Sequence, residues 1–223
     1  MIFPKTNPVL LVTALSFESR AIRLAQPTWK TISRLLPIRG FHHAQLPLYL
    51  IEVGMGFQLS VHRFREILQQ LRPRWLINFG ISGSLTPQST WGQTYQIQRI
   101  HARWRAHPLD IAIEPALQAI FPPATLFTSQ QPVRTAAERD FYHHQTDAEL
   151  VDMEAYTIIE IARSLAPRVL VLKTVSDFAD ESSLHLVKKR RSALQRRLTQ
   201  DAAALIGFLF PEGKESRIPA ISE

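Results

Sequence analysis

Cysteine is absent from this chain of 223 residues. Disulfides, thiolate metal sites and cysteine nucleophiles are therefore excluded, and nothing suggests an oxidising compartment. Long apolar runs are absent too, since none reaches the roughly 18 residues of a membrane span. The opening residues, MIFPKTNP, lack the basic segment and apolar core of a secretion signal. We therefore expect a cytoplasmic protein.

Glycine is scarce, with eight residues, and the signatures that depend on it are incomplete. The GMG sequence at 54–56 lacks the third glycine and the downstream acid of a dinucleotide site, and a tight strand-to-helix turn explains it equally well. No Walker-type GK[ST] sequence occurs. The HH pairs at 42–43 and 143–144 point to opposite sides of a strand and make no i,i+4 clamp. We expect no resident cofactor and no metal site.

Apolar segments with strand-like and helix-like periodicity alternate along the chain, which predicts an α/β fold with a mixed, mostly parallel sheet flanked by helices. Strands are expected at Val9 to Leu15, Leu48 to Val53, Arg74 to Phe79, Thr94 to Ile100, Ala124 to Thr128 and Arg168 to Ser176. Helices are expected at Gln58 to Leu71, Glu154 to Leu165 and Leu186 to Phe208. The length suits one domain over residues 1–211, and the polar segment 212–223 is expected to be a disordered tail.

One segment of the chain, residues 150–183, carries the most chemical information. Apolar residues recur at helical spacing after Glu154, and Pro167 stops that helix. The run RVLVLKTV then reads as a strand buried on both faces, so that Ser176 and Asp177 fall at its carboxyl end. Ligands of open α/β sheets bind at that edge. A carboxylate there is well placed for catalysis.

The motifs VDMEA at 151–155 and VSDFAD at 175–180 resemble VEMEA and ISDxAD of the nucleoside phosphorylase and nucleosidase superfamily, which includes 5′-methylthioadenosine/S-adenosylhomocysteine nucleosidase. VTALSFESRAI near the amino terminus, INFGISGSL at 77–85 and TSQQPV at 128–133 resemble further segments of that family in the same order. The resemblance touches most of the chain. It implies a three-layer fold, cleavage of the N-glycosidic bond of a purine nucleoside, and a homodimer or larger assembly.

The chemistry of such a cleavage assigns roles to these residues. The transition state carries a cationic, oxocarbenium-like sugar, so the site should protonate the base, orient the hydroxyls and present a nucleophile. Asp177 is the candidate general acid toward N7 of the purine. By resemblance, Glu154 binds the ribose hydroxyls, Met153 packs against the sugar and Glu18 activates the attacking water. The remaining candidates for substrate contact are Ser176, Val133, Gly80 and Ser82.

Each role has a structural alternative. Asp177 could cap the next helix, and Glu154 could be a first-turn acid that the helix dipole favours. Glu18 lies in FESR, where a solvated ion pair with a nearby arginine is an alternative to a catalytic base. Met153 could simply fill the core.

The chain also departs from the family pattern. Ile81 follows the first glycine of the central motif, where a serine or threonine is usual, and Ser82 lies one position further along. Pro132 and Val133 replace the Phe-Ile pair of the nucleosidase base pocket, which removes an aromatic surface. FGISG and TSQQPV are more similar to hopanoid-associated phosphorylases, whose substrate is a nucleoside with a large lipid tail. Water and phosphate therefore both remain open as acceptors, and phosphate would be a co-substrate.

The sequence leaves two further questions open, one about activity and one about the basic residues. The unusual residues at 81 and 132 also fit a catalytically weak protein that only binds a nucleoside. The net charge of +7 is concentrated in KKRR at 188–191 with Arg196 and Arg197. A solvated face of a terminal helix is the favoured explanation, and attachment to an anionic membrane surface is the alternative. The expected partners are a small nucleoside and further copies of the chain, with no nucleic acid.

Overall fold

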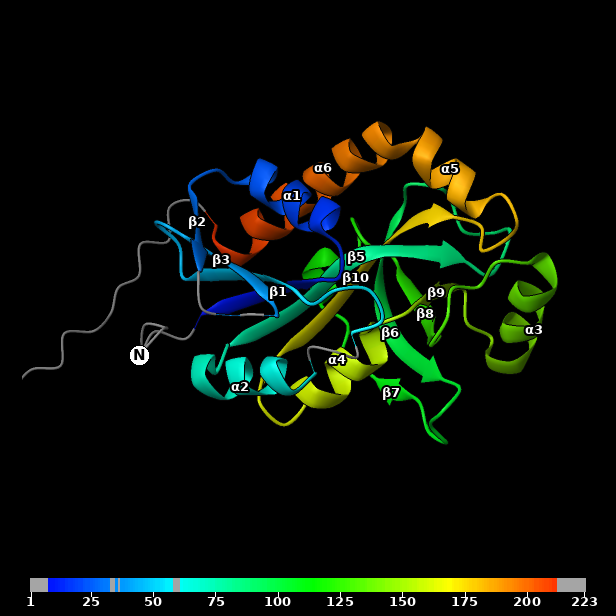
Figure 1. The fold of residues 1–223 in the computed structure, drawn as a ribbon, viewed down its shortest axis with the longest axis horizontal. Coiled ribbons are helices and arrows are strands. Elements are labelled where there is room, and N and C mark those ends of the chain that lie inside the picture. The colour runs from blue at the N-terminus through cyan, green and yellow to red at the C-terminus, as the bar shows by residue number, and fades with distance from the viewer. Residues whose placement is uncertain (1–7, 33–34, 36, 58–60, 212–223) are drawn as a thin grey trace, which may run out of the picture.

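A mixed sheet with helices on both faces forms the body of the protein in the computed structural model, which describes residues 8–32, 35, 37–57 and 61–211 (Figure 1). The expected tail at 212–223 and the first residues of the helix expected from Gln58 lie outside the described residues. The strands are β1 (Val9–Thr13), β2 (Trp29–Ile32), β3 (Arg39–His43), β4 (Leu48–Glu52), β5 (Trp75–Ser84), β6 (Thr94–Ala102), β7 (Leu109–Asp110), β8 (Pro123–Thr128), β9 (Leu150–Asp152) and β10 (Val169–Asp177).

Strand order explains how the sheet brings distant segments together. The described residues form a sheet of order β10-β6-β8-β9-β5-β1-β4-β3-β2, with β7 paired to β6 and a further pairing of β10 with β5. This last pairing closes β5, β9, β8, β6 and β10 into a ring. Strand β1 is parallel to β4 and β5, and β10 is parallel to β5, so the carboxyl ends of all four strands meet at one edge. The other part of the sheet, β4-β3-β2, is antiparallel.

One helical layer covers the upper face of the sheet in Figure 1 and consists of α1 (Ser16–Ala25), α5 (Ser183–Lys189) and α6 (Arg191–Leu209). Helix α6 presents apolar residues at a spacing of three or four residues, which puts them on one side of the helix. This side packs with Ala21 and Ile22 of α1 on Leu11, Phe79 and Leu172 of the sheet. The buried residues of α6 in this core are Leu194, Leu198, Ala202, Leu205, Ile206 and Leu209.

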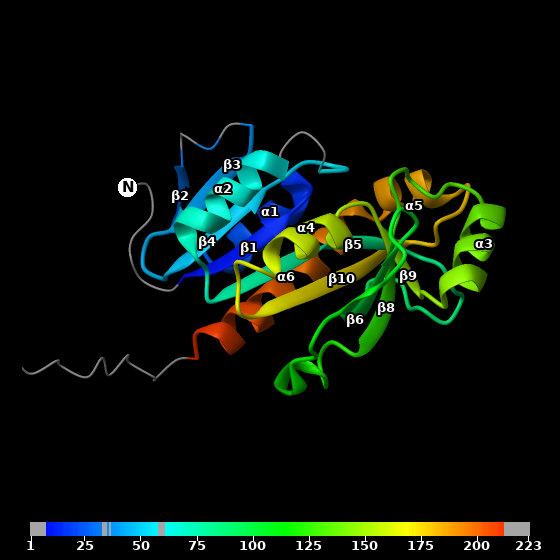
Figure 2. The same cartoon turned by 90° about the horizontal axis from the view of Figure 1, so that it is seen from below.

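The lower face of the sheet is covered by α2 (Val61–Leu71) and α4 (Ala155–Ala162), and Figure 2 shows the two helices side by side along the strands. Phe64, Ile67, Leu68 and Leu71 of α2 follow the i, i+3, i+4, i+7 pattern of a single buried stripe and are all buried. They share a core with Ile158, Ile159 and Ala162 of α4. Helix α3 (Ala136–Thr146) and the 3₁₀ turn η2 (Pro115–Leu117) lie outside these two layers.

The α/β class and the mixed sheet flanked by helices are confirmed. Two segments differ from expectation. The strand predicted at Arg74 to Phe79 continues to Ser84, because the stretch 80–84 pairs with β10 on one side and β9 on the other. The helix expected over 186–208 is two helices, separated at Arg190, whose φ of −101° and ψ of 12° leave the α-helical range.

Several elements were not predicted, although one of them, α1, does place apolar residues such as Ala21 and Ile22 on one side of the helix. Strands β2, β3, β7 and β9, together with α1 and α3, were not expected. Helix α3 has no buried residue, and β7 and β9 are only two and three residues long, so neither apolar pattern nor length could reveal them. None of the described helices is long and apolar enough to cross a membrane.

A buried carboxylate fastens α6 to the sheet. Asp201 is 4% exposed and accepts hydrogen bonds from Thr94 of β6 at 2.5 Å and from Arg197 of its own helix at 3.0 Å. The hydroxyls of Thr94 and Thr174, on β6 and β10, lie 2.6 Å apart. One side chain therefore connects α6 with the two strands that close the ring.

We predict that Asp201→Ala lowers the free energy of unfolding by roughly 1–3 kcal/mol, because it leaves buried hydroxyl and guanidinium donors without their acceptor. Urea unfolding followed by circular dichroism would measure the change. The matched control is Asp140→Ala, which removes an exposed carboxylate on α3 and should change the stability by less than about 0.5 kcal/mol. Equal losses in the two variants would contradict the proposed role of Asp201.

Candidate active site

The strand ends bring the expected site residues to one edge of the sheet. Gly83 of β5 is the register partner of Asp177 on β10 and of Val151 on β9. The two motifs that were expected to cooperate, VSDFAD and VDMEA, therefore flank a single residue of the central strand. Thr13 ends β1 next to them, and α1 follows with Glu18 in its first turn.

A buried ion pair lies at the centre of this edge. Lys173 Nζ is 2.7 Å from Asp152 Oδ2, and the two side chains are only 3% and 1% exposed. Asp152 is held further by the hydroxyl of Thr128 at 2.7 Å and the amide of Ala155 at 2.9 Å. Burial alone would lower the pKa of Lys173, but Asp152, Glu154 and Glu18 together raise it above its usual value. The ammonium is therefore charged and surrounded by three carboxyl groups.

Glu18 is buried and its carboxylate is held by backbone amides. Oε2 accepts from Ala14 at 2.9 Å and from Leu15 at 2.8 Å, while Oε1 accepts from Ile81 at 2.9 Å. Burial raises the pKa of Glu18, although Lys173 and these amides oppose the shift. The alternative of a solvated ion pair is wrong, since the described residues place no cation within ion-pair distance of Glu18. Three bonds to two oxygens leave one lone pair of Oε1 available.

Glycine at position 80 is required by Glu18. A Cβ on Gly80 would lie 2.7 Å from Oε1 of Glu18, well inside van der Waals contact. Gly80 is also the register partner of Lys173, so its missing side chain leaves room for charged groups from two other elements. The Ile81 side chain packs with the core under α1 and α6, and only its amide serves the site. The Ile81 side chain thus packs in the core, at a position where the family usually has a hydroxyl-bearing side chain.

Glu154 reaches across to the loop that follows β4. Its Oε1 accepts a hydrogen bond from the amide of Gly56 at 2.8 Å, and the residue is 6% exposed. Glu154 is the N-cap residue of α4, but its side chain makes no capping hydrogen bond. Its carboxyl group is therefore not held by the start of the helix. Burial and the neighbouring Asp152 raise the pKa of Glu154 to about 7, against the opposing effect of Lys173. Near neutrality this carboxyl group is poised between its two ionisation states.

Asp177 ends β10 and is held by its immediate neighbours. Its Oδ2 accepts from the hydroxyl of Ser176 at 2.6 Å, and Oδ1 accepts from the amide of Ala179 at 2.9 Å. Helix α5 begins only at Ser183, so Asp177 stabilises a turn and does not cap a helix. Oδ1 also lies 3.1 Å from the position that a Cβ on Gly83 would take. Ser176 in turn donates to the carbonyl of Ser82 at 3.1 Å, which fixes the end of β10 on β5.

The remaining candidates lie around these carboxylates. Val133 packs against an apolar cluster that contains Val151 and Ala179, both of which border Gly83, and the stacked rings of Phe127 and Tyr142. The cluster is therefore next to Asp177. Ser82 is 3% exposed, and its hydroxyl has no hydrogen-bond partner within the described structure. Met153 is partly buried between the two acids of VDMEA.

Two charged residues of the site escaped sequence reasoning. Asp152 was noticed only as part of a motif, and Lys173 was taken for one position of a buried strand. A signal was present, because a lysine inside the apolar run RVLVLKTV must find a counter-charge when it is buried. Asp152, which comes just before the start of α4, is the acid that provides this counter-charge.

Residues 9–207 match the phosphorylase superfamily. The chain belongs to this superfamily. A comparison with curated protein sequences gives no significant match.

Solved structures of the superfamily share the fold over nearly their whole length. The 5′-methylthioadenosine nucleosidase of Arabidopsis thaliana aligns with a TM-score of 0.80 at 19% identity, covering 94% of this chain and 97% of its own. The 5′-methylthioadenosine/S-adenosylhomocysteine nucleosidase of Helicobacter pylori gives 0.80 at 13% identity, covering 92% and 100%. The futalosine hydrolase of the same bacterium gives 0.73 at 15% identity, covering 90% and 98%. At these identities the likeness shows the fold.

The contact between Gly80 and Glu18 leads to a prediction for this superfamily member. Gly80→Ala should move the Glu18 carboxylate from its three amide donors and lower the free energy of unfolding by roughly 1–3 kcal/mol. Gly207→Ala in α6 is the matched control, because its Cβ meets no atom within 4 Å. The control should be neutral or stabilising by about 0.5–1 kcal/mol. Urea unfolding of both variants tests the difference, and a neutral Gly80→Ala would contradict it.

The raised pKa of Glu154 leads to a second prediction. Between pH 4.5 and about 7 the folded protein keeps a proton that the unfolded chain has lost, so the contribution of Glu154 makes the free energy of unfolding fall as pH rises. In Glu154→Gln, the decrease in the free energy of unfolding between pH 4.5 and about 7 should be smaller by on the order of 1–3 kcal/mol. Stability is measured by urea unfolding at several pH values. Glu160→Gln, an exposed change on the same helix, should leave the slope unchanged.

Proposed function

We propose that the protein cleaves the N-glycosidic bond of a purine nucleoside, with Asp177 as general acid. The observation that carries the proposal is the group of carboxyl groups of Glu18, Asp152 and Glu154 around the buried ammonium of Lys173. This group lies at Gly80 of β5, and Asp177 lies at Gly83, three residues further along the strand. Three residues of a strand span about 10 Å, which is enough for a sugar and the start of its base. Membership of the phosphorylase superfamily and the nucleosidase fold support this reading.

The charge of the cluster suits the reaction. Cleavage develops positive charge on the sugar ring, and a site that stabilises this charge more than the neutral substrate accelerates the step. Lys173 is paired with Asp152, so ionisation of either Glu18 or Glu154 beside this pair gives the buried cluster a net negative charge. Glu154, with its pKa near 7, is the group on which a hydroxyl of ribose could be held while the cation forms.

The base is proposed to lie on the other side of the sugar, against the apolar cluster of Val133, Phe127 and Tyr142. Asp177 borders that cluster, so an acid proton would be delivered to a nitrogen of the base and the ring would pack on apolar side chains. Aromatic surface is thus provided by β8 and α3, in place of the aromatic residue absent at positions 132 and 133. Met153 and Ser176 are proposed to contact the sugar.

Water is the acceptor that this site favours. The free lone pair of Glu18 can take a proton from water, and a carboxyl group with a raised pKa is a better base near neutrality. A phosphate dianion would meet three carboxyl groups, and the nearest cation is already paired with Asp152. The buried hydroxyl of Ser82, which has no partner in the described structure, is proposed to bind the water or a substrate hydroxyl. Phosphorolysis, including that of a lipid-tailed nucleoside, is the second candidate.

We predict that Asp177→Asn lowers the rate of base release by roughly 10²–10⁴-fold, since the amide cannot donate the proton that a positioned acid supplies. Purified protein is incubated with adenosine, inosine, methylthioadenosine and adenosylhomocysteine, with and without phosphate, and the free base is quantified. Asp180→Asn is the control, because its carboxylate lies in the same loop, accepts hydrogen bonds from the amide and the hydroxyl of Ser182, and lies 3.9 Å from Arg139.

The outcomes separate the alternatives. Base release without phosphate supports hydrolysis, whereas release that requires phosphate assigns the second candidate. Release that survives Asp177→Asn removes the assigned acid. Nucleoside binding without release of any base would leave a protein that binds its ligand without cleaving it, which contradicts the proposed function.

A further inference from the structure

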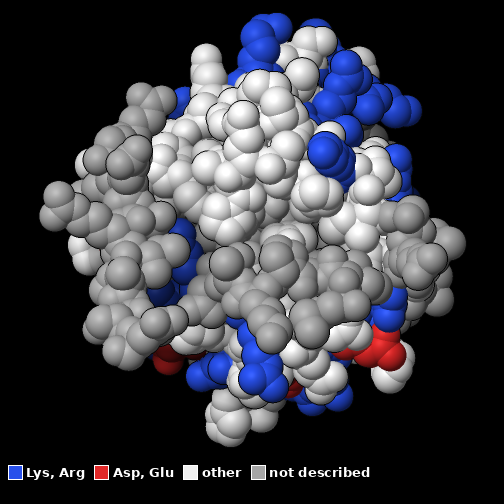
Figure 3. All heavy atoms as spheres, turned by 90° about the vertical axis from the view of Figure 1, so that its left-hand side faces the viewer, with Lys and Arg blue, Asp and Glu red and all other residues white. Residues whose placement is uncertain are grey.

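Five exposed basic residues lie at the junction of α5 and α6, and we call them the basic face. They are Lys188, Lys189, Arg190, Arg191 and Arg196, and all are exposed. No Asp or Glu occurs in the sequence from Ser182 to Gln200. Figure 3 shows Lys and Arg along the upper edge of the molecule, on the side of the helical layer with α1 and α6, and also in the lower half, where the Asp and Glu visible in this view lie.

The charges of the basic face are not neutralised within the protein. Among the described residues, no carboxylate lies within ion-pair distance of any of the five. The next arginine of the helix, Arg197, is by contrast paired with Asp201 at 3.0 Å. The basic face therefore presents unpaired positive charge to the solvent.

One exposed leucine accompanies this charge on α5, and a second lies on α1 in the same helical layer. Leu184 of α5 is 65% exposed and lies four residues before Lys188, which puts both on the same side of the helix. Leu24 of α1 is 57% exposed and lies four residues after the exposed Arg20. Helix α1 packs against α6, so the two pairs belong to one helical layer. Aliphatic side chains among unpaired cations are the pattern of a surface that enters the headgroup region of a bilayer.

We propose that the basic face binds the surface of an anionic lipid bilayer. A nucleic acid would also attract the charge, but single strands need aromatic faces on which bases stack. The two rings of this region are already covered by guanidinium groups, with Arg190 4.8 Å from the centre of Trp91 and Arg191 5.9 Å from that of Phe17. The exposed apolar groups are leucines, which insert among lipids and do not stack with bases.

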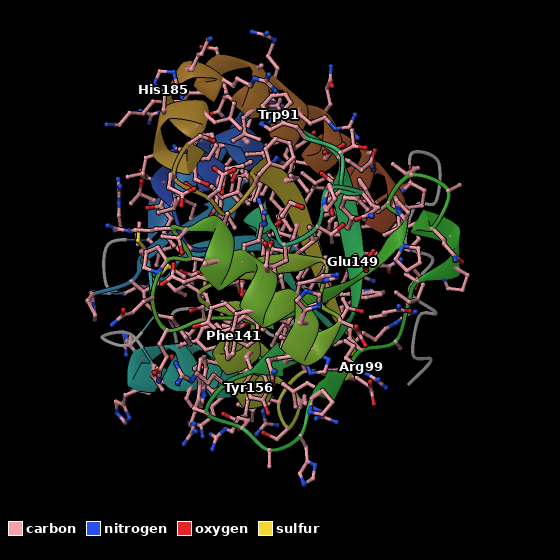
Figure 4. The ribbon with its side chains drawn as sticks, turned by 90° about the vertical axis from the view of Figure 1, so that its right-hand side faces the viewer. Trp91, Arg99, Phe141, Glu149, Tyr156 and His185 are labelled. Carbon is pink, nitrogen blue, oxygen red and sulfur yellow. The ribbon has the colours of Figure 1, made fainter. Side chains whose placement is uncertain are left out.

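The basic face is connected to the candidate site through one loop. The indole of Trp91 donates to the carbonyl of Ser176 at 2.9 Å, next to Asp177, and Gly92 donates to Val175 at 2.9 Å. Figure 4 shows Trp91 and His185 in the upper part of the molecule with α5 and α6. A protein adsorbed through the basic face would therefore hold the end of β10 near the lipid surface. The adsorption itself does not depend on the proposed function.

The test is sedimentation of the full chain with vesicles of phosphatidylcholine alone and of phosphatidylcholine mixed with phosphatidylserine. The expected result is binding to the anionic vesicles only, weakening as salt shortens the screening length, which is about 8 Å at physiological ionic strength. The triple charge reversal Lys188→Glu, Lys189→Glu and Arg196→Glu should weaken binding by at least roughly 100-fold, since each basic residue near such a surface contributes about fivefold.

The matched control reverses three exposed charges elsewhere, with Lys30→Glu, Arg65→Glu and Arg103→Glu. The control and the first variant have the same net charge. If the basic face itself binds the vesicles, only the control should bind them almost normally. Leu184→Ser should weaken binding by a smaller factor than the triple reversal. Circular dichroism of each variant checks that it is folded, and release of base from a soluble nucleoside should be unchanged in the first variant.

Several results would overturn the proposal. These are failure of the wild type to bind anionic vesicles, equal binding to vesicles of phosphatidylcholine alone, and equal weakening by the two triple variants. Binding of a single-stranded RNA that competes with vesicles and survives Leu184→Ser would assign the basic face to nucleic acid. If the first triple variant changed the oligomeric state but still bound vesicles like the wild type, the basic face would be assigned to a contact between copies of this chain.

Discussion

The ion pair between Lys173 and Asp152 is the constraint on which the candidate site depends. Both side chains are buried, and removal of either partner would leave an isolated charge in the interior, a change that destabilises proteins by about 3–5 kcal/mol. Lys173 belongs to β10 and Asp152 to β9, on either side of β5. The pair therefore fixes the positions of Glu154, which follows β9 in the chain, and of Asp177, which ends β10.

Much of the architecture could be predicted because it follows from apolar periodicity. The central strands and the helices α2, α4 and α6 each carry a buried stripe or run in the sequence. Elements without such a stripe could not be found in this way. Helix α3 has no buried residue, and its N-terminus depends on Thr135 and Glu138, a capping box that is visible only if a helix is already suspected. The predicted strand ends at Phe79, whereas β5 continues through Gly80 and Gly83 to Ser84, because pairing with β10 and β9 holds these glycines in the sheet.

The site was less predictable than the fold, because its geometry comes from contacts across long separations. Glu154 and Gly56 are 98 residues apart, and Glu18 and Ile81 are 63 residues apart. Motifs identified the carboxylates one at a time, but they could not show that Glu18 is held by backbone amides or that Lys173 lies among three acids. The departure at Ile81 illustrates the difference. In the sequence it looked like a lost hydroxyl, whereas in the structure its amide completes the binding of Glu18.

The same contacts suggest why glycines are concentrated on β5 although the chain contains so few. A side chain on Gly80 would strike Glu18, and one on Gly83 would come within 3.1 Å of Asp177, Ala179 and Val151. The carboxyl groups of Glu18 and Asp177 therefore approach β5 at positions that carry no side chain. Burial and the like charge of Asp152 both favour the protonated form of Glu154, and together they raise its pKa to about 7. A cation formed next to Glu154 would stabilise its ionised state, so the site interacts more favourably with the transition state of bond cleavage than with a neutral substrate.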